Sequence, residues 1–148
     1  MDRTILMFKP DAYERGLRDE IMKELRERVR FSILARKYKW LTDEEIEIIY
    51  GHNKGKEFWE DFVRYMKRRP VEMFLLQGKD VMERMNEVIG PTRPEDDPEK
   101  KTIRGKYGIP TYLQKGKHIE NLLHSSYDKK SYEVEKEVML WWRKEYTV

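Results

Sequence analysis

The sequence has 148 residues, a length typical of one domain built around a single hydrophobic core. Lys and Arg total 31 while Asp and Glu total 28, so the net charge is only +3 although 40% of the residues are charged. This balance argues against a protein whose main task is to coat nucleic acid. Because the sequence contains no cysteine, disulfides, thiolate nucleophiles and thiolate metal sites are excluded.

The first apolar run, residues 5–8, is too short for the core of a signal peptide or for a membrane span. We therefore expect a cytoplasmic protein without a membrane partner. A segment rich in proline and charge, residues 91–101, predicts a loop that is too short to separate two domains. The expected organisation is a single domain over residues 1–148.

Hydrophobic periodicity predicts the elements of the first half of the chain. The compact apolar run at 4–8 is typical of a buried strand. Apolar residues at every fourth position within 17–30 indicate an amphipathic helix, and the stretch 31–40 indicates a second strand. Thr42 and Glu45 have the spacing of a capping box, which predicts the start of a short helix.

The second half continues in the same manner. An apolar stripe over 58–66 predicts a helix, residues 71–77 a third strand, and residues 81–89 a helix that Gly-Pro ends. A weaker fourth strand is expected at 107–112. A C-terminal helix is indicated by a stripe made of Val134, Val138, Trp141 and Trp142.

This order of elements predicts a ferredoxin-like split βαβ fold of the α+β class. The expected architecture is a four-stranded antiparallel sheet with surrounding helices, which we expect to pack on one face of the sheet.

Several common catalytic and nucleotide-binding motifs are missing from the sequence, including the P-loop and the G-x-G-x-x-G fingerprint. The sequence instead contains residues that can bind or transfer a phosphoryl group, scattered on predicted loops. They are Lys9, Thr102, Arg104 and His124. Arg and Lys bind phosphate oxygens, and a neutral imidazole is a nucleophile near pH 7. Sequence spacing alone does not bring these four residues together.

Five segments, in order along nearly the whole chain, resemble the nucleoside diphosphate kinase family. They are Arg3 to Ala12 with Arg15-Gly16-Leu17, Val63 to Met66 with Pro70-Val71, Ile89 to Thr92 with Thr102 to Gly105, Asn121 to His124, and Glu135 to Glu137 with Trp141-Trp142. The resemblance implies ping-pong transfer of the γ-phosphate from a nucleoside triphosphate to a nucleoside diphosphate.

The resemblance also implies roles for individual residues of the catalytic segment. His124 matches the histidine that becomes phosphorylated, and Ser126 matches a serine close to it. Glu137 matches the glutamate that orients the histidine ring. Because two extra residues separate His124 from Glu137, Glu133 or Glu135 remains an alternative for this role.

The implied nucleotide-binding residues come from several segments of the chain. Lys9 corresponds to a contact with the ribose hydroxyl and the phosphates, and Asn121 to a contact with the ribose. Tyr50 corresponds to a position near the γ-phosphate, and Thr92 and Arg104 to phosphate ligands. Phe58 and Phe62 correspond to the residues that contact the base, although their helical spacing equally suits a place in the core. Magnesium (Mg2+) is the implied cofactor, held by nucleotide phosphates and water rather than by protein ligands.

The sequence departs from the family pattern at three places. Asn86 occupies the position of a family arginine, for which Arg84 or Arg93 could substitute. About seven extra residues around 110–117 leave the second wall of the base slot unassigned. The segment after His124 is longer, and Ser125 replaces a smaller residue beside the nucleophile.

These departures motivate an alternative, a nucleotide-binding regulatory protein of the same fold with reduced or lost catalysis. Basic runs at 64–69 and 100–106 suggest a weaker third hypothesis of nucleic-acid binding, against which the balanced charge argues. The resemblance implies a homo-oligomer, either a hexamer or a tetramer, and nucleoside di- and triphosphates as partners.

Overall fold

The computed structural model describes residues 1–141 and contains one antiparallel sheet with the strand order β2-β3-β1-β4. The strands are β1 (Asp2–Phe8), β2 (Ser32–Lys39), β3 (Val71–Gly78) and β4 (Leu123–Ser125). The expected antiparallel, ferredoxin-like sheet is confirmed. The first three strands lie where the hydrophobic runs predicted them.

The helices also follow the predicted pattern in most places. They are α1 (Pro10–Glu14), α2 (Arg18–Arg28), α3 (Asp43–Tyr50), α4 (Trp59–Met66), α5 (Val81–Ile89), α6 (Ile103–Tyr107) and α7 (Lys129–Trp141). At the start of α3, the Thr42 hydroxyl accepts a hydrogen bond from Glu45 N, and the Glu45 carboxylate accepts one from Thr42 N. The predicted capping box is therefore present, and it fixes the helix that ends at Tyr50.

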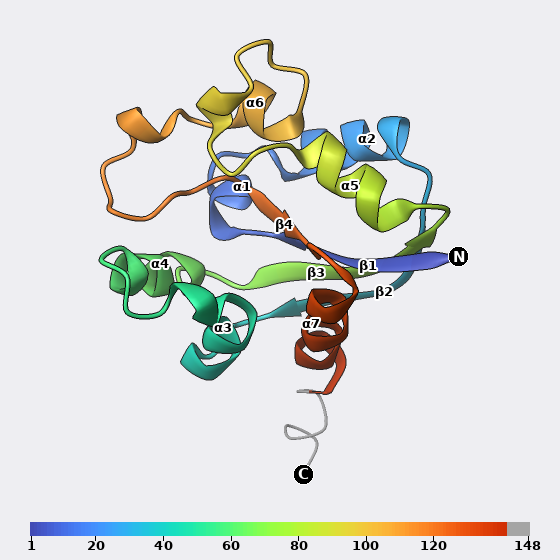
Figure 1. The fold of residues 1–148 in the computed structure, drawn as a ribbon, viewed down its shortest axis with the longest axis horizontal. Helices are drawn as coiled ribbons and strands as arrows, with labels where there is room; N and C mark the ends of the chain where they lie inside the picture. Colours follow the sequence, from blue (N-terminus) through green and yellow to red (C-terminus); the bar gives the residue numbers. More distant parts are fainter. Residues whose placement is uncertain (142–148) are drawn as a thin grey trace.

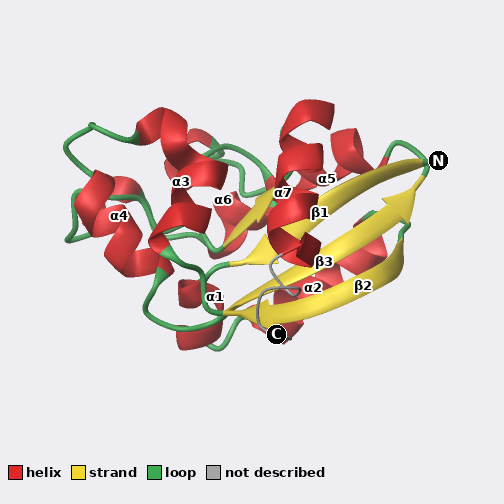
Figure 2. Cartoon of the chain, turned by 90° about the horizontal axis from the view of Figure 1, so that it is seen from below, coloured by secondary structure: helices red, strands yellow, loops and turns green. Residues whose placement is uncertain are grey.

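Helices cover both faces of the sheet, which corrects the expectation of a single covered face. In Figure 1, α2, α5 and α6 lie on one side of the strands, while α3, α4 and α7 lie on the other. Figure 2 shows the twisted sheet between these two groups from a second direction. The physical reason is that β1 and β3 are buried on both faces, so each face needs its own apolar cover.

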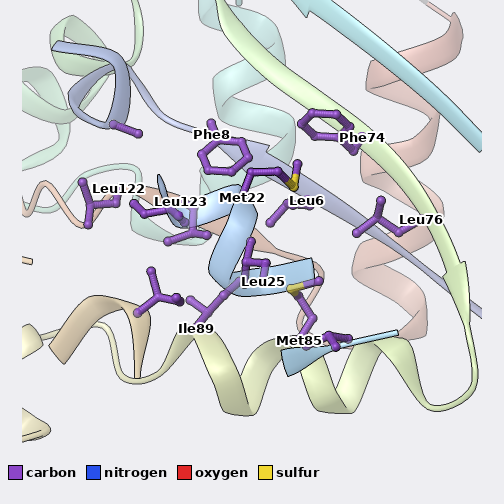
Figure 3. Close-up of a cluster of buried hydrophobic side chains, with 14 of the residues drawn as sticks. Leu6, Phe8, Met22, Leu25, Phe74, Leu76, Met85, Ile89, Leu122 and Leu123 are labelled. Atoms are coloured by element: carbon purple, nitrogen blue, oxygen red, sulfur yellow. The ribbon is translucent and has the colours of Figure 1, made fainter. Parts of the chain in front are cut away.

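The side chains of β1 alternate between two hydrophobic clusters. Leu6 and Phe8 pack against α2 and α5 in the cluster drawn in Figure 3. Ile5 and Met7 belong to the second cluster, which residues of α3, α4 and α7 complete. Successive residues of a strand point to opposite faces of the sheet. A side chain on a strand next to β1 therefore lies on the same face as the β1 residue opposite it.

The predicted fourth strand at 107–112 is wrong. Tyr107 ends α6, a short helix whose first turn is capped by the Thr102 hydroxyl, and Thr111–Leu113 form a 3-10 turn. Pro110 lacks an N–H for a ladder, so it suits a turn better than a strand. The fourth strand is β4, whose three residues are too few to produce a recognisable alternation.

The C-terminal helix forms as predicted over the described residues. Asp128 accepts a hydrogen bond from Ser131 N at the start of α7, and Val138 is buried on the side of α7 that faces the sheet. The side chain of Trp141 and all of Trp142 lie outside the described residues. In the part of the chain that the structure describes, no helix has the length and apolar character needed to cross a bilayer.

Candidate active site

One cavity of about 1200 Å³ collects residues from distant parts of the sequence. His124 lines this cavity, and so does every residue to which the family resemblance assigned a nucleotide contact. The latter set consists of Lys9, Tyr50, Phe58, Phe62, Thr92, Arg104 and Asn121. The fold therefore brings together side chains whose proximity the sequence could not establish. Thr102, the other residue whose type suits phosphate, does not line the cavity, and its hydroxyl is bound to Asp97 and to Gly105 N.

The pairing of β4 with β1 determines where His124 points. His124 lies opposite Met7, and Leu123 lies opposite Phe8. Since cross-strand partners share a face, the imidazole projects on the side of Met7, toward α3 and α7. There the ring meets Tyr50 of α3 edge to face, with the ring centroids 5.3 Å apart.

Glu135, rather than Glu137, is the carboxylate that contacts His124. Its Oε2 lies 2.9 Å from Nε2 of the imidazole, and its side chain is buried. Glu133 and Glu137 are exposed, because two positions along α7 correspond to a rotation of about 200° away from the buried face. The expected contact between Glu137 and His124 is thus corrected: Glu135, one of the alternatives, is the glutamate at the ring.

Ser126 contacts Glu135 and does not line the cavity. Its hydroxyl donates to Oε1 of Glu135 at 2.7 Å and accepts a hydrogen bond from Ile5 N at 3.0 Å. Both carboxylate oxygens are therefore bound, one by Ser126 and the other by His124. This arrangement holds the imidazole in one orientation, as is common for histidines that react through a specific nitrogen.

Lys9 occupies the junction between β1 and α1 at the base of the cavity. Its Nζ donates to Oδ1 of Asn121 at 2.8 Å, and Nδ2 of Asn121 donates to the carbonyl of Thr92 at 2.9 Å. Burial of the ammonium, with a smaller contribution from the positive charge of Arg104, lowers the pKa of Lys9 to about 7. The residue is thus poised to gain a proton when an anion enters.

Arg104 is held by main-chain oxygens. Its guanidinium donates to the carbonyls of Asn121 at 3.2 Å, Gly90 at 3.1 Å and Leu123 at 2.6 Å. Burial lowers the pKa of this guanidinium to about 10, so the side chain remains charged at neutral pH. Because these carbonyl partners carry no net negative charge, the positive charge of Arg104 is not neutralised and can attract an anionic ligand.

Aromatic side chains form another wall of the cavity. Phe62 is buried in the second core cluster and meets Tyr50 edge to face at 4.8 Å, whereas Phe58 is half-buried at the start of α4. The Tyr50 hydroxyl is buried without a hydrogen-bond partner among the described residues. Burial, reinforced by the charge of Glu135, raises the pKa of Tyr50 well above its ordinary value, so the hydroxyl stays protonated and can donate.

Asn86, the position of the expected arginine, is engaged with the strand beside His124. Its Nδ2 donates to the carbonyl of Ser126 at 3.0 Å, and its Oδ1 accepts from the Ser125 hydroxyl at 2.5 Å. Ser125 lies on the opposite face of β4 from His124, so it does not crowd the imidazole. Asn86 contributes a neutral contact to β4 and no cation to the cavity.

The extra residues around 110–117 contribute to the cavity together with His118, which the sequence analysis did not single out. The His118 ring lies 5.1 Å from the Tyr65 ring, and its Nε2 is 2.8 Å from a carboxylate oxygen of Glu120. Lys117 N donates to Asp61 of α4 at 3.2 Å. These contacts join the inserted segment to α4, and no local sequence pattern indicates them.

The cavity is suited to a metal ion that arrives with its ligand. Within residues 1–141 there is no cluster of three or more histidine and carboxylate side chains able to bind a metal ion. The carboxylate of Glu135, the acidic side chain among the described lining residues, is already bound by His124 and Ser126. The donor set therefore fits a cation held by phosphate oxygens and water rather than by a protein cage.

Comparisons with known proteins agree with this geometry. A family profile described as "Nucleoside diphosphate kinase" matches residues 2–146. A nucleoside diphosphate kinase from Hyperthermus butylicus is 39% identical over 138 residues, which cover 93% of this chain and 91% of the relative. One from Pyrococcus furiosus is 34% identical over 145 residues, covering 98% of this chain and 85% of the relative.

Solved structures of similar proteins have the same architecture. A nucleoside diphosphate kinase from Encephalitozoon cuniculi superposes with a TM-score of 0.82 at 29% identity, covering 95% of this chain and 89% of the other. A halophilic nucleoside diphosphate kinase from Halobacterium salinarum, solved in complex with CDP, gives a TM-score of 0.81 at 26% identity. That match covers 94% of this chain and 87% of the Halobacterium protein.

Proposed function

Because the chain belongs to the nucleoside diphosphate kinase family, a family of phosphotransferases, we propose that His124 carries the phosphoryl group between two nucleotides. The observation that carries the proposal is the contact between Nε2 of His124 and the buried carboxylate of Glu135. A carboxylate only accepts hydrogen bonds, so it keeps the proton on Nε2. The lone pair is then on Nδ1, which becomes the nucleophile.

In the first half-reaction, Nδ1 of His124 attacks the γ-phosphorus of a nucleoside triphosphate. A nitrogen–phosphorus bond forms while the bond from phosphorus to the β–γ bridging oxygen breaks. The nucleoside diphosphate leaves with that electron pair. Glu135 stabilises the positive charge that develops on the ring through its contact with Nε2.

The second half-reaction reverses these steps with another diphosphate. A terminal oxygen of its β-phosphate attacks the phosphohistidine, the nitrogen–phosphorus bond breaks, and its electron pair returns to Nδ1. One cavity serves both nucleotides in turn, as a ping-pong cycle requires. The two directions use the same groups, so transfer is reversible.

The remaining residues of the cavity bind and position the nucleotide. We assign phosphate contacts to Arg104, Thr92 and the hydroxyl of Tyr50, a contact with the ribose and phosphates to Lys9, and a contact with the ribose to Asn121. Charge on a transferring phosphoryl group is stabilised mainly by such positioned donors. Phe58, being half-buried at the cavity wall, offers a ring face to the base, and stacking tolerates different bases.

Magnesium is the proposed cofactor, entering as a complex with the nucleotide. When bound, it neutralises part of the phosphate charge. The chain's own contribution is the set of Lys and Arg side chains that line the cavity.

We propose further that the protein is a homo-oligomer. Support comes from β2, which lies at one edge of the described sheet and carries exposed Leu34 and Tyr38, followed by exposed Trp40. An exposed apolar edge of this kind is typical of a contact surface. Light scattering coupled to size-exclusion chromatography tests this proposal, and a monomeric mass would contradict it.

Phosphotransfer with labelled ATP tests the central proposal. Incubation with γ-labelled ATP should label the wild-type protein with an acid-labile, alkali-stable phosphate, and unlabelled nucleoside diphosphate should remove it. His124→Ala should remain unlabelled, whereas His52→Ala, a matched change at another cavity histidine, should not prevent labelling. An unlabelled wild type that still binds nucleotide would favour the alternative of a regulatory protein without turnover.

A further inference from the structure

The cavity contains more positive than negative side chains, as a polyphosphate ligand requires. Its Lys and Arg side chains, counted over residues 1–141, are Lys9, Arg93, Arg104 and Lys117, while Glu135 is its acidic side chain. A nucleoside triphosphate brings several negative charges into this space. Some of these cations already have a partner in the protein without nucleotide. A cation without a strong partner can move to bind phosphate.

Three of the cations each have a partner within the chain. Lys9 is bound to Asn121, and its lowered pKa removes part of its charge near neutral pH. Arg104 donates to three carbonyl oxygens, which restricts its guanidinium to one place. Lys117 lies 3.3 Å from a carboxylate oxygen of Glu57.

Arg93 differs from all three. Its side chain is exposed, and no carboxylate of residues 1–141 lies within ion-pair distance of its guanidinium. The contact that it does make is a long one, 3.4 Å from the guanidinium to the neutral hydroxyl of Thr111. Glu95, a nearby acid, has its carboxylate bound by the Thr111 backbone N–H and hydroxyl, and it attracts the charge of Arg93 only from beyond ion-pair distance. Arg93 can therefore turn toward a ligand without breaking an ion pair.

The backbone just before Arg93 is held at two points by residues proposed to bind the nucleotide. The carbonyl of Gly90 accepts from Arg104, and the carbonyl of Thr92 accepts from Asn121, which in turn holds Lys9. The loop 90–93 thus has a fixed position at the cavity, with an exposed guanidinium at its end. Asn86, by contrast, is neutral and committed to Ser125 and Ser126.

We propose that Arg93 binds the phosphate chain of the bound nucleotide and supplies the cation that Asn86 does not provide. This inference rests on the proposed function and names one more substrate-binding residue for the same site. A guanidinium can donate two parallel hydrogen bonds to phosphate oxygens, which gives both charge and orientation. The interaction involves the phosphates and not the nucleoside. Loss of Arg93 should therefore weaken the binding of ADP and leave the binding of adenosine unchanged.

Calorimetric titration with ADP and with adenosine, both in the presence of magnesium, tests the assignment. Arg93→Gln should weaken ADP binding roughly tenfold or more, while adenosine binding remains as in the wild type. Arg93→Lys should restore part of the affinity for ADP, because a charge is kept but the fork is lost. Arg84→Gln is the matched control, since Arg84 is exposed on α5 and does not line the cavity.

The assignment would be overturned by ADP binding of Arg93→Gln that equals the wild type, or by an equal loss for ADP and adenosine. A loss of ADP affinity in Arg84→Gln as large as that in Arg93→Gln would also overturn it. Labelling with γ-labelled ATP separates this question from the proposed function. If the wild type is labelled and Arg93→Gln binds ADP normally, only the assignment of Arg93 fails. If the wild type is not labelled but Arg93→Gln loses ADP selectively, Arg93 is a phosphate ligand and the transfer reaction fails.

Discussion

The carboxylate of Glu135 on α7 lies 2.9 Å from Nε2 of His124 on β4. The two residues are adjacent in space because α7 packs across the face of the sheet on which the imidazole projects. In the proposed function, this contact keeps the proton on Nε2 and leaves Nδ1 to react. The chemistry of the site depends on this pair.

Glu135→Gln should lower kcat by roughly 10–100-fold, by analogy with the loss of a carboxylate that orients a metal-ligating histidine. Glutamine keeps the size of the side chain but loses the charge that favours the proton on Nε2. Glu137→Gln is the control and should retain kcat, because that side chain is exposed on the other side of the helix. Steady-state kinetics on both variants provides the measurement; equal losses in the two would contradict the role of Glu135.

Tyr50→Phe should separate activity from stability. The phenolic hydroxyl is buried without a partner among residues 1–141, an arrangement that costs about 1–3 kcal/mol. Its removal should leave the free energy of unfolding unchanged or raise it, while kcat/KM falls roughly tenfold or more if the hydroxyl donates to phosphate. Urea unfolding and kinetics together provide the check. A destabilised variant with normal kcat/KM would indicate a purely structural hydroxyl.

Proton uptake should accompany ADP binding above neutral pH. The pKa of Lys9 is about 7 in the free protein, so at pH 8 the side chain is mostly neutral. Bound phosphate favours the charged ammonium and raises this pKa, and the protein takes up close to one proton. At pH 6, Lys9 is already protonated and this uptake should vanish.

Calorimetry in buffers of different ionisation enthalpy measures this uptake. Lys9→Met is the reference, because protons released by ADP itself contribute equally to the wild type and the variant. The difference between the two proteins at pH 8 should approach one proton. If the two proteins exchange the same number of protons at pH 8, Lys9 does not titrate on binding.

Gly90→Ala should destabilise the loop that carries Thr92 and Arg93. Gly90 has φ +93°, and an added Cβ would lie 2.3 Å from the Thr102 hydroxyl oxygen. Backbone strain of this kind costs of order 1–3 kcal/mol, and the overlap with Thr102 adds to it. Gly55→Ala is a matched control, since its φ is +90° but a Cβ added there would have no atom within 4 Å apart from its chain neighbours.

Thermal unfolding of both variants separates the two contributions. Gly55→Ala should lower the midpoint temperature of unfolding through backbone strain alone. Gly90→Ala should lower it further, because the added methyl group also overlaps Thr102. Gly90→Ala should also weaken ADP binding, because the Gly90 carbonyl helps to hold Arg104. Equal midpoints for the two variants would mean that the loop relaxes around the added methyl group.

Much of the fold could be predicted from local pattern. The apolar run of β1, the four-residue repeat of α2 and the capping box at Thr42 each reflect a preference that a short segment expresses by itself. Elements of low periodicity were missed. The three-residue β4 is the main example, since it gains its hydrogen bonds from β1 rather than from its own sequence.

The composition of the candidate site could also be anticipated in large part. Lys9, Arg104 and His124 were identified because their residue types suit phosphate chemistry and their segments resemble a known family. The sequence left three glutamates of α7 open for the role beside His124. The structure distinguishes them because the helical rotation about α7 turns Glu135 inward and leaves Glu133 and Glu137 in solvent.

The sequence by itself therefore determined the kinds of element, their order and the chemical groups available for phosphate transfer. Only the tertiary structure decided which of those groups meet: Met7 opposite His124, Glu135 at its ring, and Asn86 committed to Ser125. The physical reason is that periodicity and capping are local properties of the chain. Contacts between distant segments depend instead on strand register and on the rotation of each helix about its axis.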